Sequence, residues 1–276
     1  MFRKYHSFFG FPRTTLDGIA RNTIAIVGST AVSKSIHPDY GQKQATKTLR
    51  ALSLEYDTHN LYISQELENY DIVDLGDFPK NIIGRIIQSI FNNDAKALVI
   101  GGDHTTTYYC LSKTPFRDIA IFDAHLDAEE LDIKNFHHGS VTRRLITEIP
   151  TLNVKIVGFR GYSTMKKELE FLQNKKNVKI LSWPIQDNII QNIIQQTNMI
   201  SIDLDFFDPT SFWSVRVPEV FGADFSWFVN IIHRTEKTCA RYIDIVEYCP
   251  KIDNGYICGK KLLQLILEIL ALLARS

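Results

Sequence analysis

Short apolar runs of strand length recur along nearly the whole chain, and segments with helical spacing of apolar residues separate most of them. Strands are predicted near residues 23–27, 71–75, 97–100, 119–122, 154–157, 178–181, 199–204 and 242–246. Helices are predicted at 42–56, 81–91, 165–174, 188–196, 224–234 and 260–274. Strands that alternate with helices form parallel sheets with right-handed crossovers. The pattern therefore predicts an α/β fold, either a closed barrel or an open three-layer sandwich.

Composition favours one globular domain over residues 1–276, and we expect residues 1–20 to form a peripheral arm. Of the 276 residues, 45% are hydrophobic, and 31 basic residues balance 31 acidic ones. A formal charge of zero argues against nucleic acid or an acidic membrane surface as the main partner. No apolar run approaches the length of a membrane span, and the start of the chain lacks the features of a signal peptide.

The four cysteines, Cys110, Cys239, Cys249 and Cys258, show no CxxC pairing. Free thiols are therefore predicted, as is usual in cytoplasmic proteins, and we expect a cytoplasmic location. The alternative is a disulfide between Cys249 and Cys258 across a short loop.

One predicted strand runs directly into residue types that bind metals. The apolar run 119–122 is followed by Asp123, His125 and Asp127, at every second position. If the extended backbone continues, these three side chains point to one side, at the carboxyl end of a strand, where open α/β sheets place their sites. Charges beside a core are costly unless they are paired or bound to metal. For this stretch alone, salt bridges at a polar strand end are the alternative.

Two further strand ends carry the same residue types. The run Leu98-Val-Ile-Gly-Gly-Asp-His104 ends in a histidine, and Asp203 and Asp205 lie on one face of the strand that starts at Ile200. The three stretches together offer two imidazoles and four carboxylates, a set that suits a divalent ion such as Mn²⁺. Six side chains are more than one catalytic metal usually takes. Two ions that share carboxylates and activate water therefore fit better.

In order and spacing these stretches resemble the signature blocks of the arginase/agmatinase (ureohydrolase) family. The blocks stand as Gly101-Gly-Asp-His104, Asp123-Ala-His-Leu-Asp127 and Ser201-Ile-Asp-Leu-Asp-Phe-Phe-Asp-Pro209, and the resemblance covers roughly residues 20 to 275. It implies the open fold of that family, a three-layer α/β/α sandwich with a central, mostly parallel eight-stranded sheet.

The resemblance also implies how two Mn²⁺ ions would be held. One ion would be bound by a histidine and three aspartates, which are His104, Asp123, Asp127 and Asp203. The other would be bound by His125, Asp123, Asp203 and Asp205, so that Asp123 and Asp203 bridge the pair. Asp127 would also accept a hydrogen bond from the attacking hydroxide.

Hydrolysis of a guanidinium needs a proton donor for the leaving amine and a carboxylate that is not used by metal. His138, in Phe136-His-His-Gly-Ser140, matches the family's histidine–glycine block and is the implied proton shuttle, with His137 as the competing candidate. Glu247 matches the family's C-terminal glutamate, and a carboxylate can accept two parallel N–H bonds from a guanidinium. The alternatives are loop histidines without a catalytic part and a strand-end salt bridge for Glu247.

Two loops depart from the family pattern. After the second motif, the acidic segment with Glu129, Glu130 and Asp132 would repel the α-carboxylate of free arginine. After the third motif, Phe212 and Trp213 stand in a segment that replaces the usual proline- and glycine-rich loop, and they predict an aromatic rim for a larger ligand. The predicted substrate contacts are therefore Glu129, Phe212, Trp213 and Glu247.

The leading hypothesis is a Mn²⁺-dependent ureohydrolase that converts arginine within a precursor peptide to ornithine and urea. We expect it to be a homo-oligomer. The main competitor is a small guanidino compound such as agmatine, guanidinobutyrate or free arginine, followed by a formiminoglutamate-type substrate. A non-enzymatic binding protein on a degenerate arginase fold is a further alternative, but all six expected ligands are present.

Overall fold

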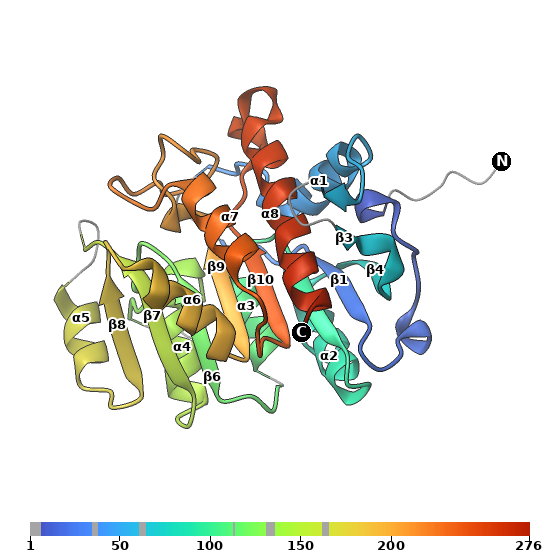
Figure 1. Cartoon of the computed structure of the whole chain (residues 1–276). Coiled ribbons are helices and arrows are strands. Elements are labelled where there is room, and N and C mark those ends of the chain that lie inside the picture. The colour runs from blue at the N-terminus through green and yellow to red at the C-terminus, as the bar shows by residue number, and fades with distance from the viewer. Residues whose placement is uncertain (1–6, 35–37, 61–64, 113, 131–135, 162–165) are drawn as a thin grey trace.

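The centre of the molecule is an eight-stranded sheet with the strand order β4-β1-β5-β10-β9-β6-β7-β8 (Figure 1). The computed structural model describes residues 7–34, 38–60, 65–112, 114–130, 136–161 and 166–276. Every neighbouring pair of strands in the sheet is parallel, and all eight predicted strands are present. The strands are β1 (Ile24–Ser29), β4 (Ile72–Phe78), β5 (Lys96–Ile100), β6 (Asp118–Phe122), β7 (Asn153–Phe159), β8 (Val178–Ser182), β9 (Met199–Asp203) and β10 (Tyr242–Val246).

Helices connect most of these strands. The described residues form α1 (Ala45–Ser53), α2 (Lys80–Asn92), α3 (Thr105–Leu111), α4 (Val141–Glu148), α5 (Lys166–Gln173), α6 (Asp187–Gln196), α7 (Phe225–Arg234) and α8 (Ile257–Ala274). Six of them were predicted, although residue 165 of one predicted range lies outside the described residues. The pattern did not predict α3 or α4, nor a small antiparallel pair, β2 (His59–Asn60) and β3 (Gln65–Glu66). Helix α3 begins with three threonines, which are β-branched and poor helix formers.

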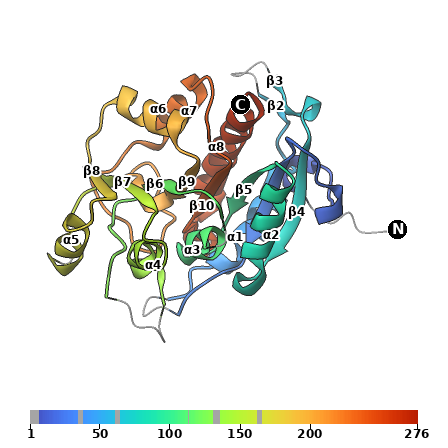
Figure 2. The same ribbon diagram turned by 90° about the horizontal axis from the view of Figure 1, so that it is seen from below.

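The helices form two layers, one on each face of the sheet, which confirms the three-layer sandwich. Side chains of α1, α6, α7 and α8 pack on one face, and those of α2, α3, α4 and α5 pack on the other. Figure 2 shows α6, α7 and α8 on one side of the sheet and α2, α3 and α4 on the other. The central strands are buried on both faces, as in most parallel sheets: Ile24 and Ile26 of β1 face one layer, while Ala25 and Val27 face the other. The edge strand β8 is only partly buried.

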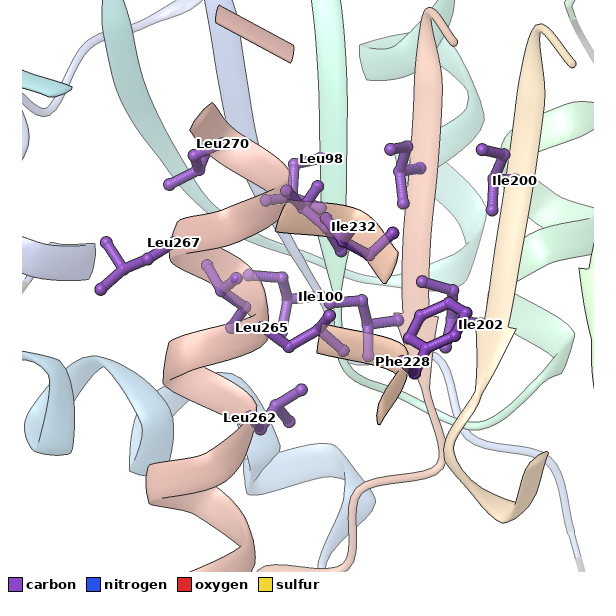
Figure 3. Close-up of a cluster of buried hydrophobic side chains, with 14 of the residues drawn as sticks. Leu98, Ile100, Ile200, Ile202, Phe228, Ile232, Leu262, Leu265, Leu267 and Leu270 are labelled. Carbon is purple, nitrogen blue, oxygen red and sulfur yellow. The ribbon is translucent and has the colours of Figure 1, made fainter. Parts of the chain in front are cut away.

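Helix α8 is buried on nearly all sides, which explains its leucine-rich sequence. Side chains from α7 and α8 meet those of β5 and β9 in one apolar cluster (Figure 3), which includes Leu98, Ile100, Ile200, Ile202, Phe228, Ile232, Leu262 and Leu265. Among the described helices, none is both long and apolar enough to cross a bilayer.

Residues 7–20 are the described part of the expected peripheral arm. They run beside β4, where the backbone N–H of Phe8 donates to the Asp74 carboxylate at 2.9 Å. Phe8, Phe9 and Phe11 are buried and belong to the core cluster on the α1 side of the sheet. The arm thus supplies part of the hydrophobic core at this edge.

Candidate metal centre

The first predicted ligand, His104, is placed by two glycines at the end of β5. Gly101 and Gly102 have φ values of +88° and +79°, which favour glycine. A Cβ on Gly102 would also come within 2.5 Å of the backbone oxygen of Ala31. The sharp turn that these glycines permit places His104 at the start of α3, fully buried.

The second motif brings its ligands together by a turn and not by the extended backbone that the spacing predicted. The backbone N–H of His125 donates to the Asp123 carboxylate at 2.6 Å, and Asp127 has φ +47°. The chain therefore bends directly after β6. Asp123 and Asp127 nevertheless both face His104, while the His125 ring turns to another carboxylate, that of Asp205.

The third motif ends β9 with a short 3-10 helix, Leu204–Phe206. Asp203 caps this helix, because its carboxylate accepts a hydrogen bond from the backbone N–H of Asp205 at 3.0 Å. Both aspartates are buried, with exposed fractions of 3% and 6%.

The predicted ligands form two adjoining groups. Nδ1 of His104 lies 2.7 Å from the Asp127 carboxylate and 3.2 Å from those of both Asp123 and Asp203. Nδ1 of His125 lies 3.0 Å from Asp205 and 3.5 Å from Asp123. Asp123 belongs to both groups, as expected of a bridging ligand.

The electrostatics of this cluster favour bound cations. Burial, together with Asp205 and Asp123, raises the pKa of Asp203 well above its usual range. Burial and Asp123 likewise raise the pKa of Asp127 to about 7. Four buried carboxylates stay ionised only beside positive charge. Moreover, three carboxylates lie within 3.2 Å of Nδ1 of His104, more than one ring nitrogen can satisfy. These donors suit a pair of divalent ions.

Four of these ligands open onto a pocket that also contains both predicted substrate-handling residues. The pocket is lined by His125, Asp127, Glu129, His138, Gly139, Glu168, Asp203, Asp205, Arg216, Val217 and Glu247. His138 lines it and His137 does not. Nε2 of His137 instead lies 3.7 Å from the Glu129 carboxylate. Of the two candidate histidines, His138 is therefore the one placed at the pocket.

Glu247 is held rigidly at the end of β10. It has φ +71°, and its carboxylate accepts hydrogen bonds from the backbone N–H of His104 at 2.9 Å and from Nε2 of Gln42 at 3.1 Å. Burial, followed by the charge of Asp103, raises the pKa of Glu247 to about 7. A cationic ligand in the pocket would favour the ionised carboxylate.

Comparison with known proteins decides the family. The sequence model of the arginase family matches residues 22–271. The chain belongs to the arginase family. It is therefore a hydrolase of the arginase and agmatinase type, which acts on guanidino C–N bonds.

Individual relatives are distant. The chain is 25% identical to human mitochondrial guanidino acid hydrolase over 74% of this chain and 65% of that one. It is 26% identical to N(1)-aminopropylagmatine ureohydrolase of Thermococcus kodakarensis, over 74% of this chain and 73% of the relative. Among solved structures, proclavaminate amidino hydrolase of Streptomyces clavuligerus superposes with a TM-score of 0.83 over 99% of this chain and 98% of that one, at 19% identity. That last likeness shows the shared fold.

In this arginase-family hydrolase the predicted aromatic rim needs correction. Phe212 is fully buried and stacks on Phe225, with ring centroids 5.2 Å apart, so it belongs to the core and does not reach the pocket. Trp213 is half-buried, lies near the Lys261 ammonium, and does not line the pocket. Of the acidic loop, Glu129 lines the pocket, while Asp132 lies outside the described residues.

Three polar residues of the pocket region were not predicted. Arg216 and Glu168 line the pocket, and the Glu219 carboxylate lies 3.9 Å from Nε2 of His125. The available signal for Arg216 was a lone arginine between two valines soon after the third metal motif. Glu168 lies on α5, far from any motif, and the sequence carries no comparable signal for it.

Proposed function

We propose that this hydrolase binds two Mn²⁺ ions and uses them to release urea from a guanidino substrate. The observation that carries the proposal is the shared pocket. The same hollow is lined by four metal-type ligands and by His138 and Glu247.

The metal ligands would be those that the resemblance implies. One ion would be held by His104, Asp123, Asp127 and Asp203, and the other by His125, Asp123, Asp203 and Asp205. A bound pair of divalent ions lowers the pKa of water, so that hydroxide is available near neutral pH. Asp127 would orient that nucleophile by accepting its hydrogen bond.

The protein's own groups would handle the substrate. Glu247 would accept N–H bonds from the guanidinium and hold its carbon toward the nucleophile. As a C–O bond forms and a C–N bond breaks, the leaving nitrogen needs a proton, which His138 would deliver. The products are an amine and urea.

Metal content tests the proposal directly. We expect about two Mn²⁺ ions per chain in the active protein, because the ligands form two adjoining groups. Elemental analysis and urea release should rise together as Mn²⁺ is added back to chelated protein. Full activity with a single zinc ion would contradict the proposed centre.

Two classes of substrate compete for the part that lies beyond the guanidinium: arginine within a peptide, and small guanidino compounds. Peptidyl arginine is favoured by Glu129, which lines the pocket. It is also favoured by Val220 and Phe221, which follow Glu219 in the chain, are 49% and 70% exposed, and offer an apolar surface to the other residues of a peptide. The burial of Phe212 in the core removes one argument for peptidyl arginine. Small guanidino compounds are favoured by the names of the relatives, which refer to agmatine and to guanidino acids.

If the substrate is peptidyl arginine, arginine blocked by acetylation and amidation should have a higher kcat/KM than free arginine. The reason is that blocking removes the α-carboxylate, which Glu129 disfavours. Urea release from free arginine, blocked arginine, agmatine and arginine-containing peptides makes the comparison. Equal or better turnover of the small compounds would reject the peptide.

Replacing Glu247 with glutamine should lower kcat/KM about 10- to 100-fold, because a charge-assisted hydrogen bond to the guanidinium is worth about 1.5–3 kcal/mol. The metal content should stay unchanged, since Glu247 groups with Asp103 and His138 and belongs neither to the His104 group nor to the His125 group. The variant should also fold, because Gln42 has a free Oε1 and can rotate its amide to accept from the new side chain. Steady-state kinetics with elemental analysis checks both expectations. A loss of metal would show that Glu247 acts on the centre itself.

A further inference from the structure

A positively charged side chain, Arg216, lies inside the pocket and has no part in the chemistry described so far. It is buried, with an exposed fraction of 7%. One of its terminal nitrogens donates to Nδ1 of His138 at 3.2 Å. Its Nε lies 3.9 Å from the Glu247 carboxylate and makes no hydrogen bond. The guanidinium therefore sits between the two residues that would handle the substrate.

Two other arginines, the buried Arg50 and the partly buried Arg160, are bonded more fully. Arg50 makes paired hydrogen bonds to Asp74, at 2.7 and 3.0 Å, and a further bond to Asp77. Arg160 donates to four backbone carbonyls. For Arg216, the bond to His138 is the one hydrogen bond found among the described residues. A guanidinium has five N–H donors, and buried donors are normally satisfied. Arg216 thus keeps donors unused in a pocket that is built for a ligand.

The chemistry of these donors limits what the ligand can be. A guanidinium accepts no hydrogen bond, so Arg216 cannot pair with the guanidinium of the substrate. Planar, bidentate pairing with a carboxylate is the arrangement that it favours. Among the described residues that line the pocket, Arg216 is the one with a permanent positive charge, whereas Glu129, Glu168 and Glu247 offer acceptors. The pocket therefore presents one donor group and several acceptor groups to the substrate.

We propose that Arg216 binds a carboxylate of the substrate, and that the preferred substrates are guanidino acids. This inference rests on the proposed urea-releasing function. The guanidinium would be held by Glu247 and the carboxylate by Arg216. Because these two side chains lie 3.9 Å apart, the substrate has only a few methylene groups between its charged ends. A carboxylate that takes the N–H groups of Arg216 also releases Nδ1 of His138, which leaves that ring free to move protons.

The test compares three compounds that differ at the end remote from the guanidinium. These are 4-guanidinobutanoate, its neutral amide and the cationic agmatine, assayed by urea release with Mn²⁺-loaded protein. The wild type should favour the acid over its amide by about 10-fold or more, since a charge-assisted pair is lost in the amide. Arg216→Gln should lower kcat/KM for the acid about 10- to 100-fold, mainly through KM, and should leave the amide within a few-fold. Arg216→Lys should recover part of the preference.

Glu129→Gln is the matched control, because it changes the charge of the same pocket but leaves Arg216, the group proposed to bind the carboxylate, in place. The preference for the acid should persist or increase, because the charge of Glu129 disfavours a carboxylate. Equal losses for the acid and the amide in Arg216→Gln would overturn the inference and leave Arg216 as a positioning residue for His138. A gain for all three compounds would overturn it too, since Arg216 would then compete with the substrate for Glu247.

Calorimetric binding of 4-guanidinobutanoate separates the failure of this inference from failure of the proposed function. Binding that depends on Arg216, without urea release from any compound, would retain the carboxylate site and reject the hydrolysis. Urea release without any preference for the acid would retain the hydrolysis and reject the site.

Discussion

Replacing Asp123 with asparagine is expected to remove both metal ions and to lower urea release by at least about 100-fold. Even residues that only support metal ligands cost about 10- to 100-fold when they are changed, and Asp123 is a ligand candidate in both groups. It lies 3.2 Å from Nδ1 of His104 and 3.5 Å from Nδ1 of His125. Asparagine keeps the shape but loses the charge that holds a cation. Elemental analysis after gel filtration, together with urea release, measures the effect.

Two further variants make the result specific. His104→Asn should lose less metal than Asp123→Asn, because His104 belongs to one group only. Asp208→Asn is a control within the same kind of motif, since Asp208 bonds to Thr210 and Gly222 and lies outside both groups. It should keep the metal. Two ions retained in Asp123→Asn would show that the bridge lies elsewhere.

The sequence was sufficient to predict the sheet because most of its strands are buried on both faces. Such strands read as continuous apolar runs, as in the run from Ile119 to Phe122. Helices α3 and α4 gave a weaker signal, because they have only seven and eight residues and α3 opens with three threonines. Helical periodicity needs a longer window than this.

The candidate ligands were also predicted, although the geometry that joins them was not. Alternation in an extended strand placed Asp123, His125 and Asp127 on one side, whereas the structure joins them through a turn at Asp123. The predicted residues still lie close together, although the local backbone differs from the one expected. In the loop after the third motif, Phe212 turned inward to the core, while Arg216 turned to the pocket.

Local sequence cannot assign such loop positions, because the direction of each side chain depends on partners far along the chain. Phe212 packs against Phe225 of α7 and Tyr248, which follows β10. Arg216 meets His138 and Glu247, which lie 78 and 31 positions away. Both arrangements depend on tertiary contacts that periodicity does not encode.

His138→Asn is expected to lower kcat about 10²- to 10⁴-fold, the usual contribution of a positioned proton donor, with two metal ions still bound. His138 lines the pocket, whereas the neighbouring His137 turns its Nε2 to Glu129 at 3.7 Å. His137→Asn is therefore the matched control and should stay within a few-fold of the wild type. Steady-state kinetics and elemental analysis on both variants make the comparison.

The pH dependence of the wild type gives an independent check on the same ring. Burial, reinforced by Arg216 and opposed in part by Asp103, lowers the pKa of His138 to about 4. The ring is then uncharged at neutral pH, so as a proton shuttle it would have to accept a proton before it delivers one to the leaving amine. Because the folded-state pKa lies below the ordinary value, protonation favours the unfolded state, and the contribution of this ring to stability is lost as the pH falls from about 6.5 to 4.

His138→Asn should remove this pH-dependent contribution to the free energy of unfolding, whereas His137→Asn should not. Urea denaturation at pH 7 and pH 4.5 measures the difference. If His137→Asn abolishes turnover and His138→Asn is silent in both assays, the proton shuttle is His137.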